Sequence, residues 1–342
     1  MSLIASMIGA VERLPLPDPV TRAGIDLLVG RTRRRLAMAP DHDFDFARAM
    51  AGFAVAEHPD AANRQHYELP AAFFGHVLGP RRKYSCCLYR DAGTTLAEAE
   101  LAALDATLEQ AEIADGQRIL ELGCGWGSLS LLMAQRYPQA RITAVSNSTP
   151  QRLYIEQRAR DAGLGNVSVV TADINAFAPE ERFDRVISVE MFEHLSNWPE
   201  MLGRVRGWLA PEGLLYIHIF THRSTAYRFD TENDADWIAQ HFFTGGIMPS
   251  HGLIRAFGDL FTVDREWQWS GTHYRRTALD WLQNFDAHDN EIKPILRDVY
   301  GIDAPLWRRR WRLFFLATAG LFGHDAGREW GVSHYRLRPV SP

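Results

Sequence analysis

The 342-residue sequence contains little lysine, little cysteine and no long apolar run. Only Lys83 and Lys293 are lysines among its 37 basic residues, and the net charge of −5 offers no basic face for nucleic acid. Cys86, Cys87 and Cys124 are too few and too irregularly spaced for a disulfide framework or a zinc site. No run approaches the ~20 apolar residues of a membrane span. We therefore expect a soluble, cytoplasmic protein without a nucleic-acid partner or a transmembrane segment.

The first part of the chain, residues 1–95, carries helical patterns interrupted by prolines and has no clear strand. This predicts a helical N-terminal extension. Its segment 2–10 is apolar, but no basic residues precede it and Glu12 interrupts it, so we expect neither a signal peptide nor a membrane anchor. Thr95 and Glu98 have the spacing of a capping box and predict the start of a helix that leads into the main domain.

Residues 96–342 are expected to form one domain in which short apolar runs alternate with helical patterns. The expected strands are 118–122, 141–146, 167–172, 184–190 and 214–220, and the expected helices between them are 128–137, 150–162 and 197–209. Such alternation is typical of a parallel sheet covered on both faces. Two later runs with period-2 patterning, 261–270 and 332–338, predict an antiparallel pair that completes a seven-stranded sheet. Residues 221–260 and 275–330 then become helical insertions that cover the active site.

A glycine-rich loop follows the first expected strand, where residues 119–127 read Ile-Leu-Glu-Leu-Gly-Cys-Gly-Trp-Gly. Glycine has no Cβ, so a ligand can lie against the bare backbone of Gly123, Gly125 and Gly127. A dinucleotide site instead requires the spacing Gly-x-Gly-x-x-Gly, with a helix N-terminus for the pyrophosphate. Glu121 precedes these glycines, and its acid suits the ammonium and sulfonium of S-adenosylmethionine. The loop therefore predicts an α/β, class I (Rossmann-like) methyltransferase that releases S-adenosylhomocysteine.

Polar side chains at the ends of the next two strands are candidates for binding the rest of this cofactor. Asp173 ends the third strand, where its carboxylate can accept a hydrogen bond from the adenine amino group, with Ile174 as an apolar wall. Asn147 follows the second strand and Gln151 lies one turn into the next helix, where neutral amides can bind the ribose hydroxyls. The alternatives are a solvated loop acid for Asp173, and turn or cap residues for the two amides.

Two carboxylates and an imidazole follow the fourth strand, as Glu190, Glu193 and His194. Ligands bind at the carboxyl ends of strands in open α/β folds, so these three residues are the catalytic candidates. A helical turn there would put Glu190 and His194 on one side, at positions i and i+4. Metal binding is the alternative. Because His-Glu-x-x-His spacing is absent and methyl transfer requires no metal, we expect no metal site.

Several motifs in a fixed order resemble the cyclopropane-fatty-acyl-phospholipid synthase superfamily of S-adenosylmethionine-dependent methyltransferases. They are the glycine loop, Tyr84-Ser-Cys-Cys87, Glu190-Met-Phe-Glu-His194, His218, Phe242-Phe-Thr-Gly-Gly-Ile-Met-Pro-Ser250 and Ser270-Gly-Thr-His-Tyr274. The similarity is strongest to the coclaurine N-methyltransferase-like branch and extends from about Tyr67 to Tyr335. The ordered set is specific for the superfamily and less specific for the methyl acceptor.

The resemblance also implies roles for single residues. It implies that Ser85 and the loop from Gly123 to Gly127 face the methionine part, Asn147 and Gln151 the ribose, Asp173 and Ile174 the adenine, and Glu190, Glu193 and His194 the acceptor. In cyclopropane synthases, the positions that match Cys86, Glu193, His218 and Tyr274 bind a bicarbonate that acts as base, which leaves bicarbonate open as a second small ligand here. Phe220, however, replaces the aliphatic residue whose backbone completes that site. The first ~66 residues do not resemble the lipid-binding N-terminal domain of those enzymes.

The expected reaction is attack by an acceptor on the sulfonium methyl group. For an amine, Glu193 and His194 are the groups expected to accept the proton that must leave the nitrogen. Aromatic residues and an acid suit a small, cationic, alkaloid-like amine, and the candidates are Trp237, Phe242, Phe243, Trp269 and Glu190. The alternative is an unsaturated acyl chain, as in a cyclopropane-fatty-acyl-phospholipid synthase or another lipid methyltransferase. A homodimer is a further open expectation.

An arginine-rich segment near the C-terminus has Trp307, Trp311 and Phe315 at positions i, i+4 and i+8. Arginines occupy most of the positions between them. This pattern favours a helix packed on its own domain with a solvated arginine face. Peripheral contact with a membrane surface is the alternative.

Overall fold

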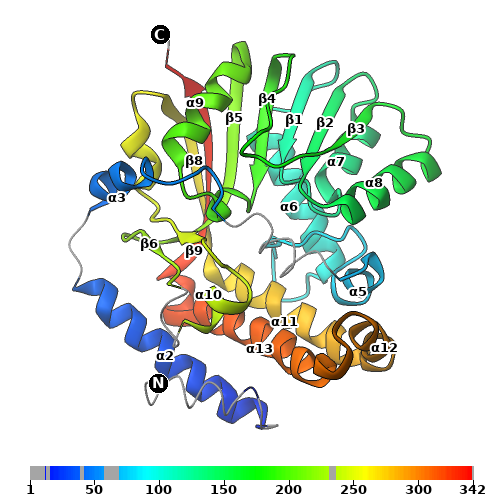
Figure 1. Cartoon of the computed structure of the whole chain (residues 1–342), viewed down its shortest axis with the longest axis vertical. Helices are drawn as coiled ribbons and strands as arrows, with labels where there is room; N and C mark the ends of the chain where they lie inside the picture. Colours follow the sequence, from blue (N-terminus) through cyan, green and yellow to red (C-terminus); the bar gives the residue numbers. More distant parts are fainter. Residues whose placement is uncertain (1–11, 13–15, 39–41, 58–68, 231–235, 341–342) are drawn as a thin grey trace.

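The computed structural model describes residues 12, 16–38, 42–57, 69–230 and 236–340, so the apolar segment 2–10 lies outside the described residues. The centre of the molecule is a seven-stranded sheet in the order β3-β2-β1-β4-β5-β9-β8 (Figure 1). The strands are β1 (Arg118–Leu122), β2 (Arg141–Ser146), β3 (Val167–Thr171), β4 (Phe183–Val189), β5 (Leu209–His222), β8 (Phe261–Ser270) and β9 (Trp330–Pro339). Strands β1 to β5 are parallel, and β9 runs antiparallel to both β5 and β8. The expected seven-stranded, mostly parallel sheet is confirmed.

Helices precede or connect the parallel strands and cover the sheet. They are α6 (Leu96–Gln110), α7 (Ser128–Arg136), α8 (Thr149–Asp161) and α9 (Trp198–Trp208). Helix α6 begins with the expected capping box, in which the Thr95 hydroxyl and the Glu98 carboxylate each accept a hydrogen bond from the other residue's backbone N–H. The box satisfies two amides that have no partner within the helix. In β1, four of the five residues are buried, as a strand covered on both faces requires.

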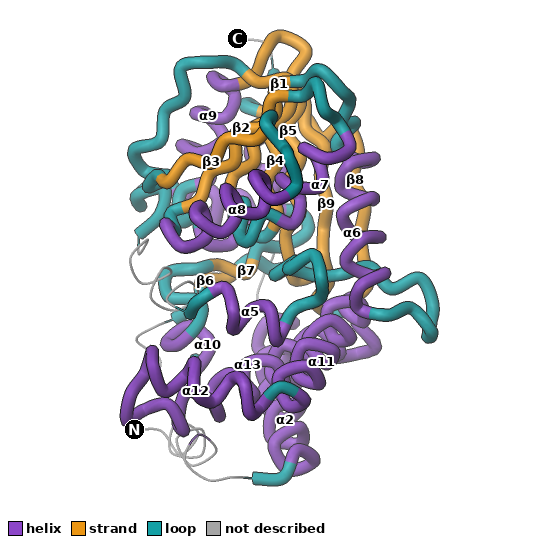
Figure 2. Tube along the Cα trace, turned by 90° about the vertical axis from the view of Figure 1, so that its right-hand side faces the viewer, coloured by secondary structure: helices purple, strands orange, loops and turns teal. Residues whose placement is uncertain are grey.

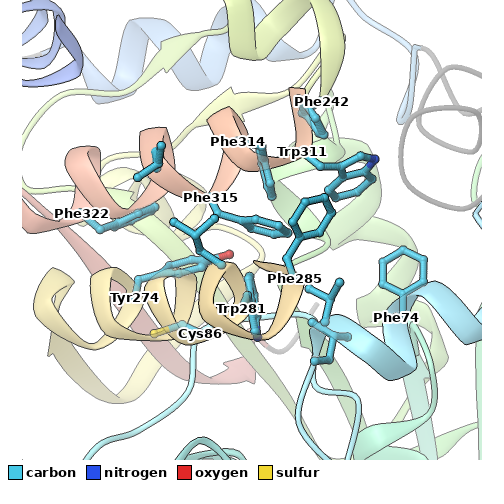
Figure 3. Close-up of a cluster of buried hydrophobic side chains, with 14 of the residues drawn as sticks. Phe74, Cys86, Phe242, Tyr274, Trp281, Phe285, Trp311, Phe314, Phe315 and Phe322 are labelled. Atoms are coloured by element: carbon cyan, nitrogen blue, oxygen red, sulfur yellow. The ribbon is translucent and has the colours of Figure 1, made fainter. Parts of the chain in front are cut away.

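A helical half lies beyond the carboxyl ends of the parallel strands (Figures 1 and 2). It contains α2 (Asp18–Ala37), α5 (Ala71–Val77), α11 (Gly271–Ala287), α12 (Asp289–Tyr300) and α13 (Ala304–Gly323). Aromatic side chains of α11 and α13 pack between these two helices (Figure 3). Tyr274 stacks on Phe322 with ring centroids 4.4 Å apart. This packing fixes the position of Tyr274, which is one of the candidate site residues.

Residues 221–260 differ from the expected helical insertion. They contain the two-stranded antiparallel sheet of β6 (Tyr227–Arg228) and β7 (Ile247–Met248), the single-turn helix α10 (Trp237–His241) and the 3-10 turn η2 (Leu253–Phe257). Helix α10 is followed by Gly245, whose φ of 75° places the chain in the left-handed region that favours glycine. The strand that follows is apolar and buried, which favours sheet pairing over a second helical turn. Helix α3 (Asp43–Met50) contacts η2.

The arginines of α13 form ion pairs and hydrogen bonds with neighbouring elements. Arg308 pairs with Asp289 at 2.5 Å, Arg310 with Glu12 at 3.0 Å, and Arg312 with Asp286 at 2.7 Å and Asp18 at 2.9 Å, while Arg309 donates to the Glu12 carbonyl at 2.6 Å. Trp311 and Phe315 are fully buried on the opposite side. The packed helix is therefore confirmed, and the solvated arginine face is wrong. Within the part of the chain that the structure describes, no helix combines the length and apolarity needed to cross a membrane.

Candidate active site

A pocket lies at the carboxyl ends of the parallel strands and brings most of the predicted cofactor residues together. Its lining residues are Ala56, Gly123, Gly125, Val145, Ser146, Asn147, Gln151, Ala172, Asp173, Ile174, Met191, His194, Leu195 and Thr244. The loops after β1, β2, β3 and β4 all contribute to it. This is the edge of an open α/β sheet at which ligands bind. Ala56 and Thr244 also line it; Thr244 belongs to the Phe242–Ser250 motif but was not assigned to the cofactor, and no signal in the sequence indicated Ala56.

The three glycines of the loop adopt a backbone conformation that favours glycine. Gly123, Gly125 and Gly127 have φ values of 78°, 52° and 79°, in the left-handed region. A Cβ at Gly123 would lie 2.8 Å from the side chain of Met191, and one at Gly127 would lie 2.6 Å from that of Ile155. A Cβ at Gly125 would meet no protein atom within 4 Å. Gly125 is therefore the glycine that exposes bare backbone to the pocket.

The amide of Gln151 is the clearest unsatisfied polar group in this pocket. Its side chain is buried, and its Oε1 accepts a hydrogen bond from the Ser146 hydroxyl at 2.7 Å. Its Nε2 is also buried but has no hydrogen-bond partner among the described residues. A buried donor without an acceptor costs about 1–3 kcal/mol, so this group fits a ligand hydroxyl.

Asp173 lies at the mouth of the pocket and is exposed. Its Oδ1 accepts hydrogen bonds from the backbone N–H and the side-chain amide of Asn175, at 2.9 and 3.0 Å. The Asn175 amide group in turn bonds the backbone N–H and carbonyl of Ala56, each at 3.0 Å. Asp173 thus helps to hold the segment after α3 against the pocket.

Three of the predicted cofactor residues, Ser85, Glu121 and Gly127, are buried and do not line this pocket among the described residues. The Ser85 hydroxyl accepts a hydrogen bond from Lys83 Nζ at 2.5 Å. The Glu121 carboxylate accepts one from the hydroxyl of Ser130, on α7. Burial raises the pKa of Glu121 to about 7. Glu121 therefore ties β1 to α7, which the spacing of the loop alone did not predict.

Glu190 is held by three groups from distant parts of the chain. Its Oε1 accepts a hydrogen bond from the Cys86 backbone N–H at 2.8 Å and lies 3.3 Å from His218 Nε2. Its Oε2 accepts one from the Tyr274 hydroxyl at 2.6 Å. Of the four residues considered for bicarbonate, three therefore contact the carboxylate of Glu190. These are Cys86, His218 and Tyr274. The expected helical turn from Glu190 to His194 is wrong, because Glu190 has a φ of 48° and only the 3-10 turn η1 (Phe192–His194) follows.

Glu193 is fully buried and only half satisfied. Its Oε1 accepts a hydrogen bond from the Phe220 backbone N–H at 2.7 Å. Its Oε2 has no partner among the described residues. Burial, with a contribution from the charge of Glu190, holds the pKa of Glu193 well above its usual range. The two carboxylates thus differ in environment, since Glu190 has three partners and Glu193 has one.

Aromatic rings pack beside His194. The His194 ring stacks on Phe243 at 4.9 Å between centroids, and Phe243 also contacts Phe220 at 5.6 Å and Phe229 at 5.5 Å. Of the aromatic residues predicted for the acceptor, only Phe243 belongs to this group. Trp269 packs against His218 on the sheet, while Trp237 and Phe242 join the aromatic cluster with α13. Phe229 was missed because its position depends on the small β6–β7 sheet.

The three side chains that belong to the residues around Glu190, those of Cys86, His218 and Tyr274, are held in their neutral forms. Burial keeps the pKa of the Cys86 thiol and of the Tyr274 hydroxyl well above their usual ranges, with the charge of Glu190 acting in the same direction. Burial keeps the pKa of His218 well below its usual range. A neutral Tyr274 hydroxyl can donate to Glu190, as the geometry requires. Among the described residues, no group of three His, Cys, Asp or Glu side chains is arranged to hold a metal ion.

Comparison with known proteins relates this geometry to a family. A family model described as mycolic acid cyclopropane synthetase matches residues 56–326. An (S)-coclaurine N-methyltransferase from Thalictrum flavum subsp. glaucum is 37% identical to the chain, over 97% of this chain and 95% of its own length. A cyclopropane-fatty-acyl-phospholipid synthase from Escherichia coli (strain K12) is 30% identical over 79% of this chain and 66% of its own length.

Solved structures give the same result. A crystal structure of coclaurine N-methyltransferase bound to N-methylheliamine and S-adenosylhomocysteine superimposes with a TM-score of 0.92 at 33% identity, covering 98% of this chain and all of that one. A cyclopropane synthase from Mycobacterium tuberculosis shares the fold, with a TM-score of 0.70 at 22% identity over 84% of this chain. The chain therefore belongs to the mycolic acid cyclopropane synthetase family of S-adenosylmethionine-dependent methyltransferases, in the branch that contains the coclaurine N-methyltransferases.

Proposed function

We propose that the protein transfers a methyl group from S-adenosylmethionine to the nitrogen of a small, aromatic, alkaloid-like amine. The observation that carries the acceptor side of this proposal is the buried Oε2 of Glu193, which has no partner among the described residues. A carboxylate oxygen of this kind, next to an aromatic wall, is suited to accept the proton of a secondary ammonium. The relatives of 30% identity or more include enzymes named for alkaloid N-methylation, which supports the same acceptor class.

On the cofactor side, the residues fit S-adenosylmethionine, which supplies an activated methyl group when bound. Gly125 would allow the methionine part to approach the backbone, and the free Nε2 of Gln151 would donate to a ribose hydroxyl, together with Asn147. Asp173 would accept from the adenine amino group beside the apolar side chain of Ile174. Ser85 and Glu121 would act indirectly, through the segments that they tie together.

On the acceptor side, we assign different roles to the two carboxylates. Glu193 accepts the proton, because its raised pKa makes it a stronger base than an ordinary carboxylate. Glu190 is the fixed anion that stabilises positive charge on the amine, because three groups hold it in place. His194 positions the acceptor ring from its stack with Phe243. Environments that separate the pKa values of two neighbouring acids are typical of such a division of roles.

We propose that bicarbonate is not required. Cys86 donates its N–H, and Tyr274 its hydroxyl, to Glu190, and His218 lies within reach of the same carboxylate. Those groups are therefore already engaged by a carboxylate that belongs to the chain. The carboxylates paired with Arg308, Arg310 and Arg312 also reduce the positive charge that α13 could offer to a vesicle. The three free, buried cysteines are compatible with a reducing cytoplasm.

The test is a comparison of acceptors with labelled S-adenosylmethionine. Purified protein is incubated with a panel of benzylisoquinoline-type amines and, separately, with vesicles of unsaturated phospholipid, each with and without dissolved carbonate, and products are identified by mass. We expect N-methylated amines, at rates that rise with pH toward the amine's pKa and do not depend on carbonate. Turnover confined to vesicles and restored only by bicarbonate would identify a cyclopropane synthase and overturn the proposal.

A further inference from the structure

Lys83 is a buried lysine that the proposed mechanism does not use. It is one of only two lysines in the sequence, and only 2% of its surface is exposed. Its Nζ donates to the Ser85 hydroxyl at 2.5 Å and to the Cys86 carbonyl at 2.6 Å. Both acceptors are neutral. A buried ammonium is costly unless an opposite charge compensates it, so a carboxylate near Lys83 is required.

The geometry connects Lys83 to Glu190 through one residue. Cys86 receives the Lys83 ammonium at its carbonyl and donates its backbone N–H to Glu190 Oε1 at 2.8 Å. The Lys83 ammonium thus binds the carbonyl of Cys86, and the Glu190 carboxylate binds the backbone N–H of the same residue. The other buried acid nearby is Glu100, which accepts the backbone N–H groups of Arg81 and Lys83 at 2.8 and 3.1 Å. The hydrogen bonds of Glu100 come from backbone N–H groups, although the charge of Lys83 also acts on it. The contacts of Glu190 instead lead into the active site.

We propose that Lys83 is a positioning residue of the methyl-transfer reaction, which keeps Glu190 ionised and fixes the Ser85–Cys86 segment against it. The proposal rests on the proposed function, because it assigns a role to Lys83 in the same site. Lys83 acts through Glu190 and touches neither reacting atom. Consistent with this role, burial raises the pKa of Glu190, and the charge of Lys83 is foremost among the influences that oppose the rise.

The consequence concerns how the two carboxylates ionise together. The titratable groups that face them come from four elements of the fold and their loops: Lys83, Cys86, Cys87, His218, His334 and Tyr274. Lys83 is the only cationic group in this set, since burial lowers the pKa of both histidines. Without Lys83, Glu190 is harder to ionise, and so is the state in which both carboxylates are ionised at once. Without the charge of Glu190, ionisation of Glu193 becomes easier.

The test measures kcat against pH at saturating S-adenosylmethionine and amine for Lys83→Met, Glu190→Gln and Lys293→Met. Lys293 is the matched control, because it is the other lysine and pairs with Asp289 on an exposed part of α12. We expect the acid limb, the low-pH part of the profile on which kcat rises with pH, to move to higher pH in Lys83→Met. At the pH where the wild type is half-maximal, kcat should then fall at least about 10-fold. We expect the limb to move to lower pH in Glu190→Gln and to stay in place in Lys293→Met. Lys83→Arg, which keeps the charge, should return the limb toward the wild-type position.

A merely structural role for Lys83 predicts a different result. It would lower the amount of folded protein or raise KM without moving the limb, and an unmoved limb in Lys83→Met would overturn the proposal. If Lys83→Met is too unstable for kinetics, its melting temperature is compared with that of the double variant Lys83→Met/Glu190→Gln. We expect the double variant to be more stable than Lys83→Met, because it removes the unpaired charge as well. A double variant of equal or lower stability would overturn the proposal.

If the wild type does not methylate any amine, the proposed function fails. The melting-temperature comparison then still tests the electrostatic interaction between Lys83 and Glu190.

Discussion

The cofactor pocket lies beside the carboxylate centre, which consists of Glu190, Glu193 and the groups that contact them. The two are built in opposite ways. The pocket takes its residues from the ends of successive strands, and its key groups, such as Gly125 and Asp173, are partly or fully exposed. The centre takes Lys83, Glu190 and Tyr274 from segments up to 191 residues apart, counted from 83 to 274; Lys83 and Tyr274 are buried, and the Glu190 side chain is 7% exposed. The first is a loop motif that a ligand can approach, and the second is a buried charge network that tertiary packing assembles.

This difference suggests which measurements respond to each part. A substitution in the pocket should change cofactor affinity and leave the pH dependence of turnover alone. A substitution in the centre should change kcat and its pH dependence and leave cofactor affinity alone. A substitution in the pocket that moved the pH dependence, or one in the centre that weakened cofactor binding, would break this separation.

The largest effect is expected for Glu193→Gln. Loss of the base should lower kcat by roughly 10²- to 10⁴-fold, with the dissociation constant of S-adenosylmethionine unchanged. In the wild type, kcat should rise with pH through the raised pKa of Glu193, because the base must be ionised. Burial disfavours the charged form, so the stability contributed by the wild-type acid is lost as pH rises through its folded pKa. The glutamine variant should therefore be at least as stable as the wild type at alkaline pH. Equal losses in cofactor affinity would instead indicate a structural role.

The next effect is expected for Gly125→Ala. A methyl group there meets no protein atom but enters the space beside the bare backbone, so S-adenosylmethionine affinity should fall by roughly 10²-fold, or about 2.7 kcal/mol. Gly163→Ala is the matched control, because Gly163 also has a positive φ, of 67°, and open space around its Cβ, but lies after α8, away from the pocket. Calorimetry should find normal affinity in the control. Unchanged affinity in folded Gly125→Ala would refute the assigned position of the cofactor.

A smaller effect is expected for Asp173→Ala. Loss of one polar contact to the adenine should weaken cofactor binding by on the order of 1–3 kcal/mol, with kcat at saturation nearly unchanged. Asn175→Ala separates this contact from the support of Ala56, because Asn175 bonds both residues. If Asn175→Ala weakens binding as much as Asp173→Ala, the carboxylate acts by holding the segment and not by binding adenine.

The smallest effect is expected for Arg312→Ala on α13. Its guanidinium pairs with Asp286 and Asp18 and so joins α13 to α11 and α2. Partly exposed ion pairs contribute little, and we expect a loss of about 1 kcal/mol in the free energy of unfolding, measured by urea denaturation. Vesicle binding should be absent in both wild type and variant. Vesicle binding by the wild type that is lost in the variant would restore the membrane alternative for this helix.

Sequence reasoning reached the pocket because its signals are local. Gly123, Gly125 and Gly127 form a pattern within one turn, and Asp173 and Gln151 follow strands whose apolar runs are visible in the sequence. The carboxylate centre was only partly accessible. The residues themselves were identified, but their pairing was not, because a φ of 48° at Glu190 and the approach of Cys86 depend on long-range packing. The sequence offered one indication of Lys83: lysine is rare in this chain, and Lys83 directly precedes the Tyr84-Ser-Cys-Cys87 motif.

The backbone at Glu190 has a φ of 48°, a conformation that glycine adopts more readily than glutamate does. A glycine at this position would relieve the strain and leave Cys86 N–H, His218 and the Tyr274 hydroxyl around an empty space the size of a carboxylate. We therefore expect Glu190→Gly to fold and to recover part of its lost turnover when formate or bicarbonate is added, whereas Glu190→Gln, whose amide fills the space, should not respond. The Glu190 side chain alone would then decide whether the anion at this site belongs to the protein or is bound from solution.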